Sequence, residues 1–585
     1  MILSSRNFLP NAAVVLGAVL LASCAGQAVQ SPAETADLIL TNARVYTVET
    51  ARPWAEAVAI DNGKIVAVGS AKDVLKYRGA DTRTVDLGGR LLMPAFGDAH
   101  VHPVFGGMAY TRCSLHSGKT VEDYQKIIAG CVAASPGDGP IYGVGWQDAL
   151  FPPKGVPRKE LLDAVTAQRA LIFESVGGHS YWVNSKALKI AGITKDTPDP
   201  ANGHIDRDPA TGEPVGGLQE AAMALVGDLI PKPTAEEVQQ SIVYVAHLFN
   251  SLGITNWHDA GIDLAADGTS ETLAAYHAVK DRGELSAHVS LAFKWENERG
   301  LEQIPAIRAA SERAAAWGIS AKSVKFYADG VIPQQTAAMI APYEHAGDHR
   351  GPLQITPETL AQAITTLGKD GFQPHVHAIG DRAVRVALDA FAAAKNSNGT
   401  ANRPMISHLN VVDPADQPRF GKLGVIAQFQ PTWASNYPYM DLTKQAIGPV
   451  RSGYIYPSHG ILAPGGMIAY GADWPVATAN PLFGLQVAVT RVNYEEPATP
   501  PLLPKEAITL EQAIRAHTLN VAYANGMETL TGSIAPGKSA DLVVLDRNIF
   551  TLAPLEIGKA KVMVTLFEGR PVFGNWSSLG AAKEP

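Results

Sequence analysis

Five side chains of types that bind metal ions recur at the ends of short apolar runs in this sequence. His100 and His102 alternate at the end of the first run, so on a strand both imidazoles point to one side. His377, His408 and Asp473 each end or follow another such run. Neutral imidazole is the commonest metal ligand, and carboxylate oxygens complete many sites. A single His-x-His pair is weak evidence, but the five residues together predict a divalent metal site.

Alternating strand and helix patterns in the middle of the chain indicate how these residues are brought together. Helical patterns cover residues 236–252, 356–370 and 381–395. Eight apolar runs separate such segments, and eight β/α units predict a (β/α)8 TIM barrel, an α/β fold whose functional residues gather at the C-terminal strand ends. The predicted strands end near His102, Asp259, Phe293, Asp329, His377, His408, Gln430 and Asp473.

The two ends of the chain carry a different pattern. Short β-type runs separated by turn residues occupy residues 36–93 and recur within 500–585, which predicts one small β-sandwich built from both chain ends. The barrel is then expected over residues 94–499. The stretch after the first barrel strand is too long for one crossover, so an insertion is expected at about 110–235.

Size and charge restrict the class of protein. A chain of 585 residues is expected to form more than one domain. Its composition, with 46% hydrophobic and 18% charged residues, is that of a globular protein. The net charge of −8 and the absence of a basic tract argue against nucleic-acid binding.

The N-terminus has the pattern of an export signal. Arg6 precedes a short apolar segment at residues 12–21, which is too short to span a bilayer as a helix. The sequence Leu21-Ala22-Ser23-Cys24 follows, and it resembles a bacterial lipobox. Residues 1–24 are then expected to be a lipoprotein signal peptide region, in which Cys24 becomes the lipidated first residue after cleavage. Residues 25–35 are then expected to be a flexible tether. The residue after Cys24 is not Asp, which favours the outer membrane, with the protein facing the periplasm; the alternative is an ordinary signal peptide with an incidental cysteine.

Two further cysteines, Cys113 and Cys131, lie within the expected insertion. An exported protein meets an oxidising compartment, where these two residues could form a disulfide. Two separate buried thiols are the alternative.

Eight segments, distributed along most of the chain, resemble motifs of the amidohydrolase superfamily, in the branch that contains N-substituted formamide deformylase. Together they are specific, whereas any one alone would not be. They are residues 94–102, 143–146, 179–188, 324–330, 377–383, 407–408, 471–476 and 532–541.

The resemblance implies a ligand set for one or two divalent ions, with zinc the expected metal. The first ion would be held by His100, His102 and Asp473, and the second by His377 and His408. Lys325 stands where many members carry a carboxylated lysine that bridges two metals. An ammonium group has no lone pair to offer a metal, and carboxylation would supply oxygen ligands. The alternatives are an ion pair of Lys325, for example with Asp329, and a site with one metal.

The chemistry implied is hydrolysis of a carbon–nitrogen bond in a small-molecule amide, N-acyl or N-formyl compound. A metal-bound hydroxide would attack, and Asp473 would act as general base and then general acid. Trp146 and His179, in the insertion, could line the substrate pocket or serve only in packing. A deaminase or cyclic amidase on the same scaffold, or a non-catalytic lipoprotein that binds a metal or solute, are the alternatives. The oligomeric state, including a homodimer, stays open.

Overall fold

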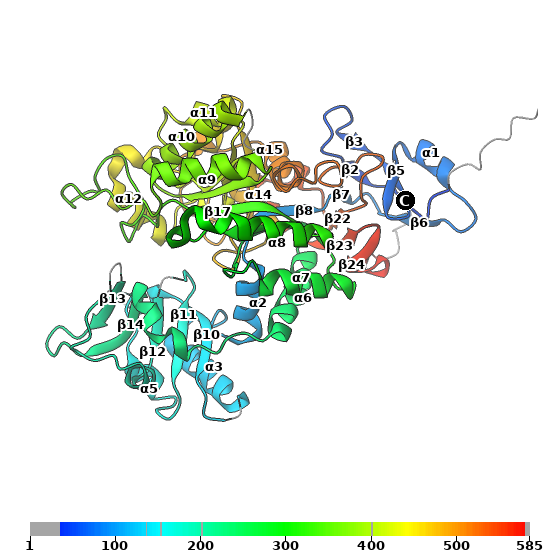
Figure 1. Cartoon of the computed structure of the whole chain (residues 1–585). Helices are drawn as coiled ribbons and strands as arrows, with labels where there is room; N and C mark the ends of the chain where they lie inside the picture. Colours follow the sequence, from blue (N-terminus) through cyan, green and yellow to red (C-terminus); the bar gives the residue numbers. More distant parts are fainter. Residues whose placement is uncertain are drawn as a thin grey trace, which may run out of the picture.

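The fold was analysed in a computed structural model, which describes residues 35–135, 137–151, 155–178, 180–200, 203–398 and 402–579. Its centre is an eight-stranded parallel sheet in which each strand pairs with the next along the chain (Figure 1). A backbone bridge between Val101 and Trp474 joins the first strand to the segment after the last, so the sheet closes as a TIM barrel. The strands are β8 (Phe96–Val101), β15 (Ile254–Ile262), β16 (His288–Lys294), β17 (Ser320–Tyr327), β18 (Gln373–Ala378), β19 (Met405–His408), β20 (Ile426–Phe429) and β21 (Met467–Tyr470).

Helices follow most of these strands and cover the outside of the barrel. In α6 the Thr234 side chain caps the first turn, and Val238, Ile242, Val245 and Phe249 recur at helical spacing and are buried. One apolar stripe is thereby directed onto the strands. The main covering helices are α6 (Ala235–Ser251), α7 (Glu271–Asp281), α8 (Ile304–Ala316), α9 (Pro357–Lys369), α10 (Asp381–Asn398), α11 (Gln417–Leu423), α12 (Pro438–Ser452), α13 (Ser458–Leu462) and α14 (Pro481–Thr490).

Both chain ends contribute to a pair of small sheets. Strand β7, from the N-terminal part, pairs antiparallel with β22 from the C-terminal part, with Pro94 opposite Leu542. Leu40, Leu92 and Val544 share one buried apolar cluster, so the two sheets pack face to face. One sheet has the order β5 (Lys64–Gly69), β4 (Ala57–Asp61), β1 (Leu38–Thr41) and β6 (Arg83–Asp86). The other has the order β24 (Arg570–Phe573), β23 (Val562–Phe567), β22 (Leu542–Leu545), β7 (Leu91–Pro94), β2 (Arg44–Tyr46) and β3 (Trp54–Ala55).

The segment from residue 500 onward does not all belong to the sandwich. Helices α15 (Leu510–His517) and α16 (Leu519–Ala524) come before β22 and pack on the barrel. Ile514 is part of the barrel core, and Val521 lies in a buried cluster with Ala99 of β8. The expected boundary at residue 500 therefore places two barrel helices on the wrong side, because their apolar faces match the barrel and not the sandwich.

The insertion forms a sheet and apolar clusters of its own, set apart from the barrel in Figure 1. Helix α2 (Pro103–Thr111) leads into it from β8. Its sheet has the order β13 (Gly203–Arg207), β14 (Pro214–Glu220), β12 (Ser180–Val183), β11 (Leu171–Ser175), β10 (Ile141–Trp146) and β9 (Cys113–Ser114). A disulfide between Cys113 and Cys131 ties β9 to α3 (Val121–Ala134).

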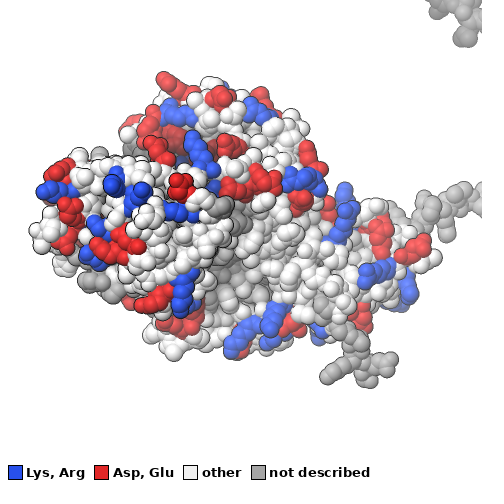
Figure 2. Space-filling view, turned by 90° about the horizontal axis from the view of Figure 1, so that it is seen from below, with Lys and Arg blue, Asp and Glu red and all other residues white. Residues whose placement is uncertain are grey.

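Charges of both signs are interspersed on the face shown in Figure 2. This face offers no broad basic surface of the kind that binds nucleic acid. Among the described helices, none combines the length and apolar character needed to cross a bilayer. The expected export signal, Cys24 and nearly all of the tether lie outside the described residues.

Candidate active site

Strand β8 delivers the two alternating histidines to the C-terminal end of the barrel. His100 is fully buried within the strand. His102 follows the strand end, precedes α2, and leaves about a quarter of its side chain (25%) exposed. One imidazole therefore lies inside the barrel and the other at its rim.

Asp473 lies between these two histidines. Its Oδ1 atom is 3.4 Å from Nε2 of His100 and 3.1 Å from Nε2 of His102. The residue follows β21 in a left-handed conformation with φ of 58°, which Asp tolerates better than most residues. Its backbone N–H donates to the carbonyl of His100 at 2.7 Å. Barrel closure thus fixes the carboxylate against the histidines of β8.

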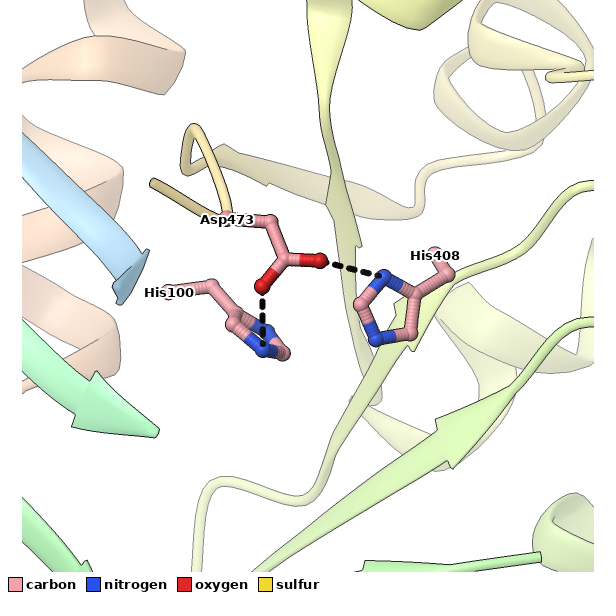
Figure 3. A group of neighbouring side chains, drawn as sticks. All are labelled: His100, His408 and Asp473. Atoms are coloured by element: carbon pink, nitrogen blue, oxygen red, sulfur yellow. Dashed lines mark ion pairs between the residues drawn. The ribbon is translucent and has the colours of Figure 1, made fainter. Parts of the chain in front are cut away.

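His408, at the end of β19, completes a compact group. Its Nδ1 is 3.8 Å from Oδ2 of Asp473, and the ligand atoms of His100, His408 and Asp473 all lie within 4.8 Å of one another (Figure 3). Within the described part of the chain, no other set of three or more His, Cys, Asp and Glu side chains comes together in this way. All three are buried.

His377 lies beside this group. It comes from β18, and its ring centre is 4.5 Å from that of His408. Its Nε2 is 3.3 Å from the carbonyl of Gly330 and 3.7 Å from Oδ1 of Asp329. The structure therefore places His377 next to the compact group without including it.

Lys325 points into the same space from β17. It is buried, and its Nζ is 3.0 Å from Nε2 of His100. Burial lowers the pKa of the amine to about 7. Asp329 accepts three backbone N–H groups, from Ala338, Ile379 and Gly380, and the described ion pairs do not join it to Lys325. The alternative of a Lys325–Asp329 ion pair is not what the structure has.

The electrostatics of the group suit a cation. Burial lowers the pKa of His100 and His377 well below the usual value and that of His408 to about 4, so these imidazoles are neutral. Burial alone would raise the pKa of Asp473, but the hydrogen bond from His102 and the nearby His408 bring it below its usual range. Neutral imidazoles around a charged carboxylate are the donor set of a divalent-metal site, and zinc binds such N and O ligands. The residues present fit a metal.

Most of the sequence also matches one known protein family. A family model described as the amidohydrolase family matches residues 83–573. The chain belongs to the amidohydrolase family. This amidohydrolase is a metal-dependent hydrolase of carbon–nitrogen bonds.

Relatives and solved structures match it over most of its length. The Protein LONG AFTER FAR-RED 3 of Arabidopsis thaliana is 28% identical, with 92% of each chain covered. The N-substituted formamide deformylase of Arthrobacter pascens is 24% identical over 91% of this chain and 97% of that protein. A metal-dependent hydrolase of Pyrococcus furiosus, 22% identical, superposes with a TM-score of 0.68 over 88% of this chain and 99% of that one. The last comparison shows the fold.

Trp146 does not occupy a pocket. Its side chain is fully buried in the insertion, where it packs edge-on against Phe151 and donates from Nε1 to the carbonyl of Phe173 at 2.8 Å. Of the two alternatives for Trp146, the structure has the packing role and not the lining of a substrate site, because both its ring and its polar atom are used in the core of the insertion. His179 lies outside the described residues.

Several polar residues that hold the site were not predicted. Asp98 is buried and accepts the backbone N–H groups of His100 at 2.9 Å and of Ala472 at 3.0 Å, so it joins the first strand to the loop that carries Asp473. Its position two residues before His100, on the same strand face, is a signal that could have identified it. Gln428 and Gln430 contact the ring nitrogens of His100 and His408 at 3.1 and 3.2 Å.

Proposed function

We propose that this amidohydrolase cleaves the amide bond of a small N-acyl or N-formyl compound, with Asp473 moving the proton. One observation carries the proposal: His100, His408 and Asp473 converge within 4.8 Å at the C-terminal end of the barrel. In TIM-barrel enzymes this end is where catalysis takes place. The A. pascens relative, a deformylase of N-substituted formamides by its name, supports the substrate class.

The metal ligands in this proposal are the predicted ones. His100, His102 and Asp473 would hold one divalent ion, zinc by its preference for N and O donors, and His377 with His408 would hold a second. A bound ion would acidify a coordinated water and polarise the substrate carbonyl.

Asp473 is suited to proton transfer by its charge and its contacts. Its carboxylate is ionised, and its two oxygens face different partners, Oδ1 the histidines of β8 and Oδ2 His408. It takes a proton from the water that adds to the carbonyl carbon. It then returns this proton to the nitrogen as the carbon–nitrogen bond breaks, which releases an acid and an amine.

Lys325 becomes a ligand if it is carboxylated. A neutral amine attacks carbon dioxide, which forms a carbamate and releases one proton. Two features support this reaction: the amine is buried, and its Nζ lies 3.0 Å from Nε2 of His100, where an added carboxylate would face the metal ligands. In protein equilibrated with 13C-labelled bicarbonate we expect one carbamate carbon resonance that Lys325→Met lacks. A spectrum identical in the two proteins would show that Lys325 is unmodified.

The function is tested with a panel of N-acyl amino acids, N-substituted formamides and cyclic amides. We expect turnover of one acyclic class, loss on treatment with a chelator, and recovery with zinc. Asp473→Asn should lower kcat by at least about 10²-fold, which is the low end of general-base contributions. Asp541→Asn is the matched control, because Asp541 is a buried carboxylate of the sandwich that accepts from Ser539 and Glu568. Full activity of Asp473→Asn would remove this residue from its role, and turnover of cyclic amides alone would favour a cyclic amidase.

We also propose that the protein is exported and anchored by a lipid on Cys24. The lipobox-like residues 21–24 support this, and so does the disulfide Cys113–Cys131, which is typical of an oxidising compartment. Cys24→Ala should move the protein from the membrane fraction to the soluble periplasmic fraction. Equal membrane association of the variant would contradict the lipid anchor.

A further inference from the structure

Strand β20 contributes no metal ligand, yet it directs two buried amides at the metal site. Gln428 lies within the strand and Gln430 directly after it, and both are fully buried. Residues two apart on a strand point to the same side, so both amides face the barrel interior. An amide buried among apolar strands is unfavourable unless it is hydrogen-bonded, which raises the question of what these two do.

The orientation of the first amide follows from its neighbours. The Nε2 group of Gln428 donates to the carbonyl oxygens of Phe429 at 3.0 Å and Gly471 at 3.5 Å. Carbonyl oxygens only accept, so the nitrogen end of the amide must point to them. The oxygen end therefore faces Nδ1 of His100, at 3.1 Å.

The second amide is oriented by the first. Nε2 of Gln430 donates to Oε1 of Gln428 at 3.1 Å, so the oxygen of Gln430 is left to face Nδ1 of His408 at 3.2 Å. If this amide were reversed, two carbonyl oxygens would oppose each other. The pair forms an ordered chain that runs from the carbonyl oxygens of Phe429 and Gly471 to both histidines.

An acceptor oxygen beside Nδ1 selects one form of a neutral imidazole. The single ring proton must then sit on Nδ1, and Nε2 carries the lone pair. In His100 this Nε2 atom is the one that faces Asp473 and Lys325. In His408 the Nδ1 atom that faces Gln430 also lies 3.8 Å from Oδ2 of Asp473. Second-layer hydrogen bonds of this kind orient metal-binding histidines and increase their basicity.

A buried hydroxyl is compatible with the same form of His100. Oγ of Ser407 lies 3.1 Å from Nδ1 of His100 and 2.5 Å from Nε2 of His375, so it can accept from the first and donate to the second. His375 in turn has its Nδ1 3.2 Å from Nε2 of His258. This row of side chains is therefore compatible with the proton on Nδ1 of His100 that Gln428 requires.

We propose that Gln428 and Gln430 are positioning residues of the metal centre: the ordered amide of Gln428 holds His100 with Nε2 free to bind the metal, and that of Gln430 holds the ring of His408 through its Nδ1. This inference rests on the proposed metal site. The two amides explain why β20, which contributes no ligand, carries buried polar side chains at the level of the site.

The test measures metal affinity rather than activity alone. Zinc binding to the apo-protein is titrated in competition with a chromogenic chelator for Gln428→Met, Gln430→Met and Gln430→Glu. Methionine keeps the approximate volume and removes the acceptor, so each Met variant should bind zinc about 10- to 100-fold more weakly. Gln430→Glu keeps an acceptor oxygen towards His408 but replaces the donor to Oε1 of Gln428 with a second oxygen, so it should regain only part of the affinity. The visible spectrum of the cobalt-loaded protein should change in the Met variants and change less in Gln430→Glu.

Gln373→Met is the matched control. Gln373 is a buried glutamine of β18 whose side-chain amide donates to the carbonyls of Arg403 and Ala524, and these described hydrogen bonds do not involve the histidines. Its loss should lower thermal stability and leave the zinc affinity unchanged.

The outcomes separate this inference from the proposed function. If His100→Ala abolishes zinc binding while both Met variants bind as tightly as the unaltered protein, the site stands and the positioning role is refuted. If His100→Ala binds zinc normally, the proposed metal site itself is refuted. If Gln373→Met weakens zinc binding as much as the Met variants of β20, the effect is one of general stability and the inference also fails.

Discussion

Asp259 shows what burial does to a carboxylate near the metal site. It is buried in β15 and accepts a hydrogen bond from the hydroxyl of Tyr276 at 3.0 Å. Burial raises its pKa from the usual 3.8 to about 6. Between these two values the folded protein holds a proton that the unfolded chain has lost, so stability falls as the pH rises through this window.

Asp259→Asn should remove this loss, because asparagine resembles the protonated acid and its oxygen can still accept from Tyr276. Above pH 6 the variant should be more stable by up to about 3 kcal/mol, whereas near pH 4 the two proteins should be nearly equal. Thermal midpoints measured from pH 4 to pH 8 check this, with the exposed Asp348→Asn as control. A constant difference across the range would show that Asp259 does not titrate in this window.

Helix α2 packs against the residue that follows Asp473 and so helps to fix the position of this carboxylate. A β-carbon added at Gly106 of α2 would come within 2.1 Å of the ring of Trp474, the residue after Asp473. Trp474 also packs edge-on against Phe249 of α6, so its ring has little room to move. The absence of a side chain at Gly106 lets the helix hold this ring in place.

Gly106→Ala should therefore displace Trp474 and the neighbouring carboxylate, lowering both stability and kcat, the latter by up to about 10²-fold. Gly130→Ala in α3 is the matched control, since nothing lies within 4 Å of the added carbon. Gly130→Ala should raise the free energy of unfolding by about 0.4–1 kcal/mol and leave kcat unchanged. Wild-type kcat in Gly106→Ala would mean that α2 does not position the site.

The disulfide of the insertion is expected to stabilise the insertion without affecting the metal site. Cys113 and Cys131 are 18 residues apart, and closing a loop of this length stabilises by about 3 kcal/mol in the chain-entropy account. Replacing both with serine should increase hydrogen exchange in residues 113–220 and leave zinc affinity unchanged. Reducing agent should have the same effect on the unaltered protein and none on the variant. Equal hydrogen exchange in the unaltered protein, the reduced protein and the serine variant would show that the disulfide adds no stability.

The elements were largely predictable, because their patterns are local. The eight barrel strands were each predicted, since a buried parallel strand is a continuous apolar run. Strand β15 was expected to end near Asp259 but continues to Ile262, because an irregularity in its pairing with β16 lies between these two residues. Such an irregularity depends on the neighbouring strand and leaves no local pattern.

The site was predictable in its residue types and less so in its contacts. Histidines and a carboxylate after apolar runs predicted a group of possible metal ligands, and the structure brings His100, His408 and Asp473 together. Trp146 could not be placed, because a motif does not show whether its ring faces a pocket or a core. The roles of Gln428 and Gln430 depend on strands that are adjacent in space, β19 and β21, and so required the structure.

At the scale of the whole molecule, the C-terminal strands support the strand that carries the first metal ligands. β22 pairs with β7, and the backbone N–H of Ala95, just before β8, donates to the carbonyl of Asp541 at 2.9 Å. All four residues of β22 are fully buried. At about 1.5–3 kcal/mol for each buried aliphatic side chain, their loss would remove about 6–12 kcal/mol.

That loss is comparable with the entire net stability of an ordinary domain, about 5–15 kcal/mol. A chain that ends at residue 539 should therefore fail to accumulate as folded protein and should bind no zinc. A chain comprising residues 35–585 retains every described strand of the sandwich and should keep full kcat/KM. Soluble yield, thermal unfolding and zinc content of the two truncated proteins check this. A folded, zinc-binding protein that ends at residue 539 would show that the barrel holds its first strand without help from the sandwich. His100 would then be held by contacts within the barrel, among them those of Asp98 and Gln428.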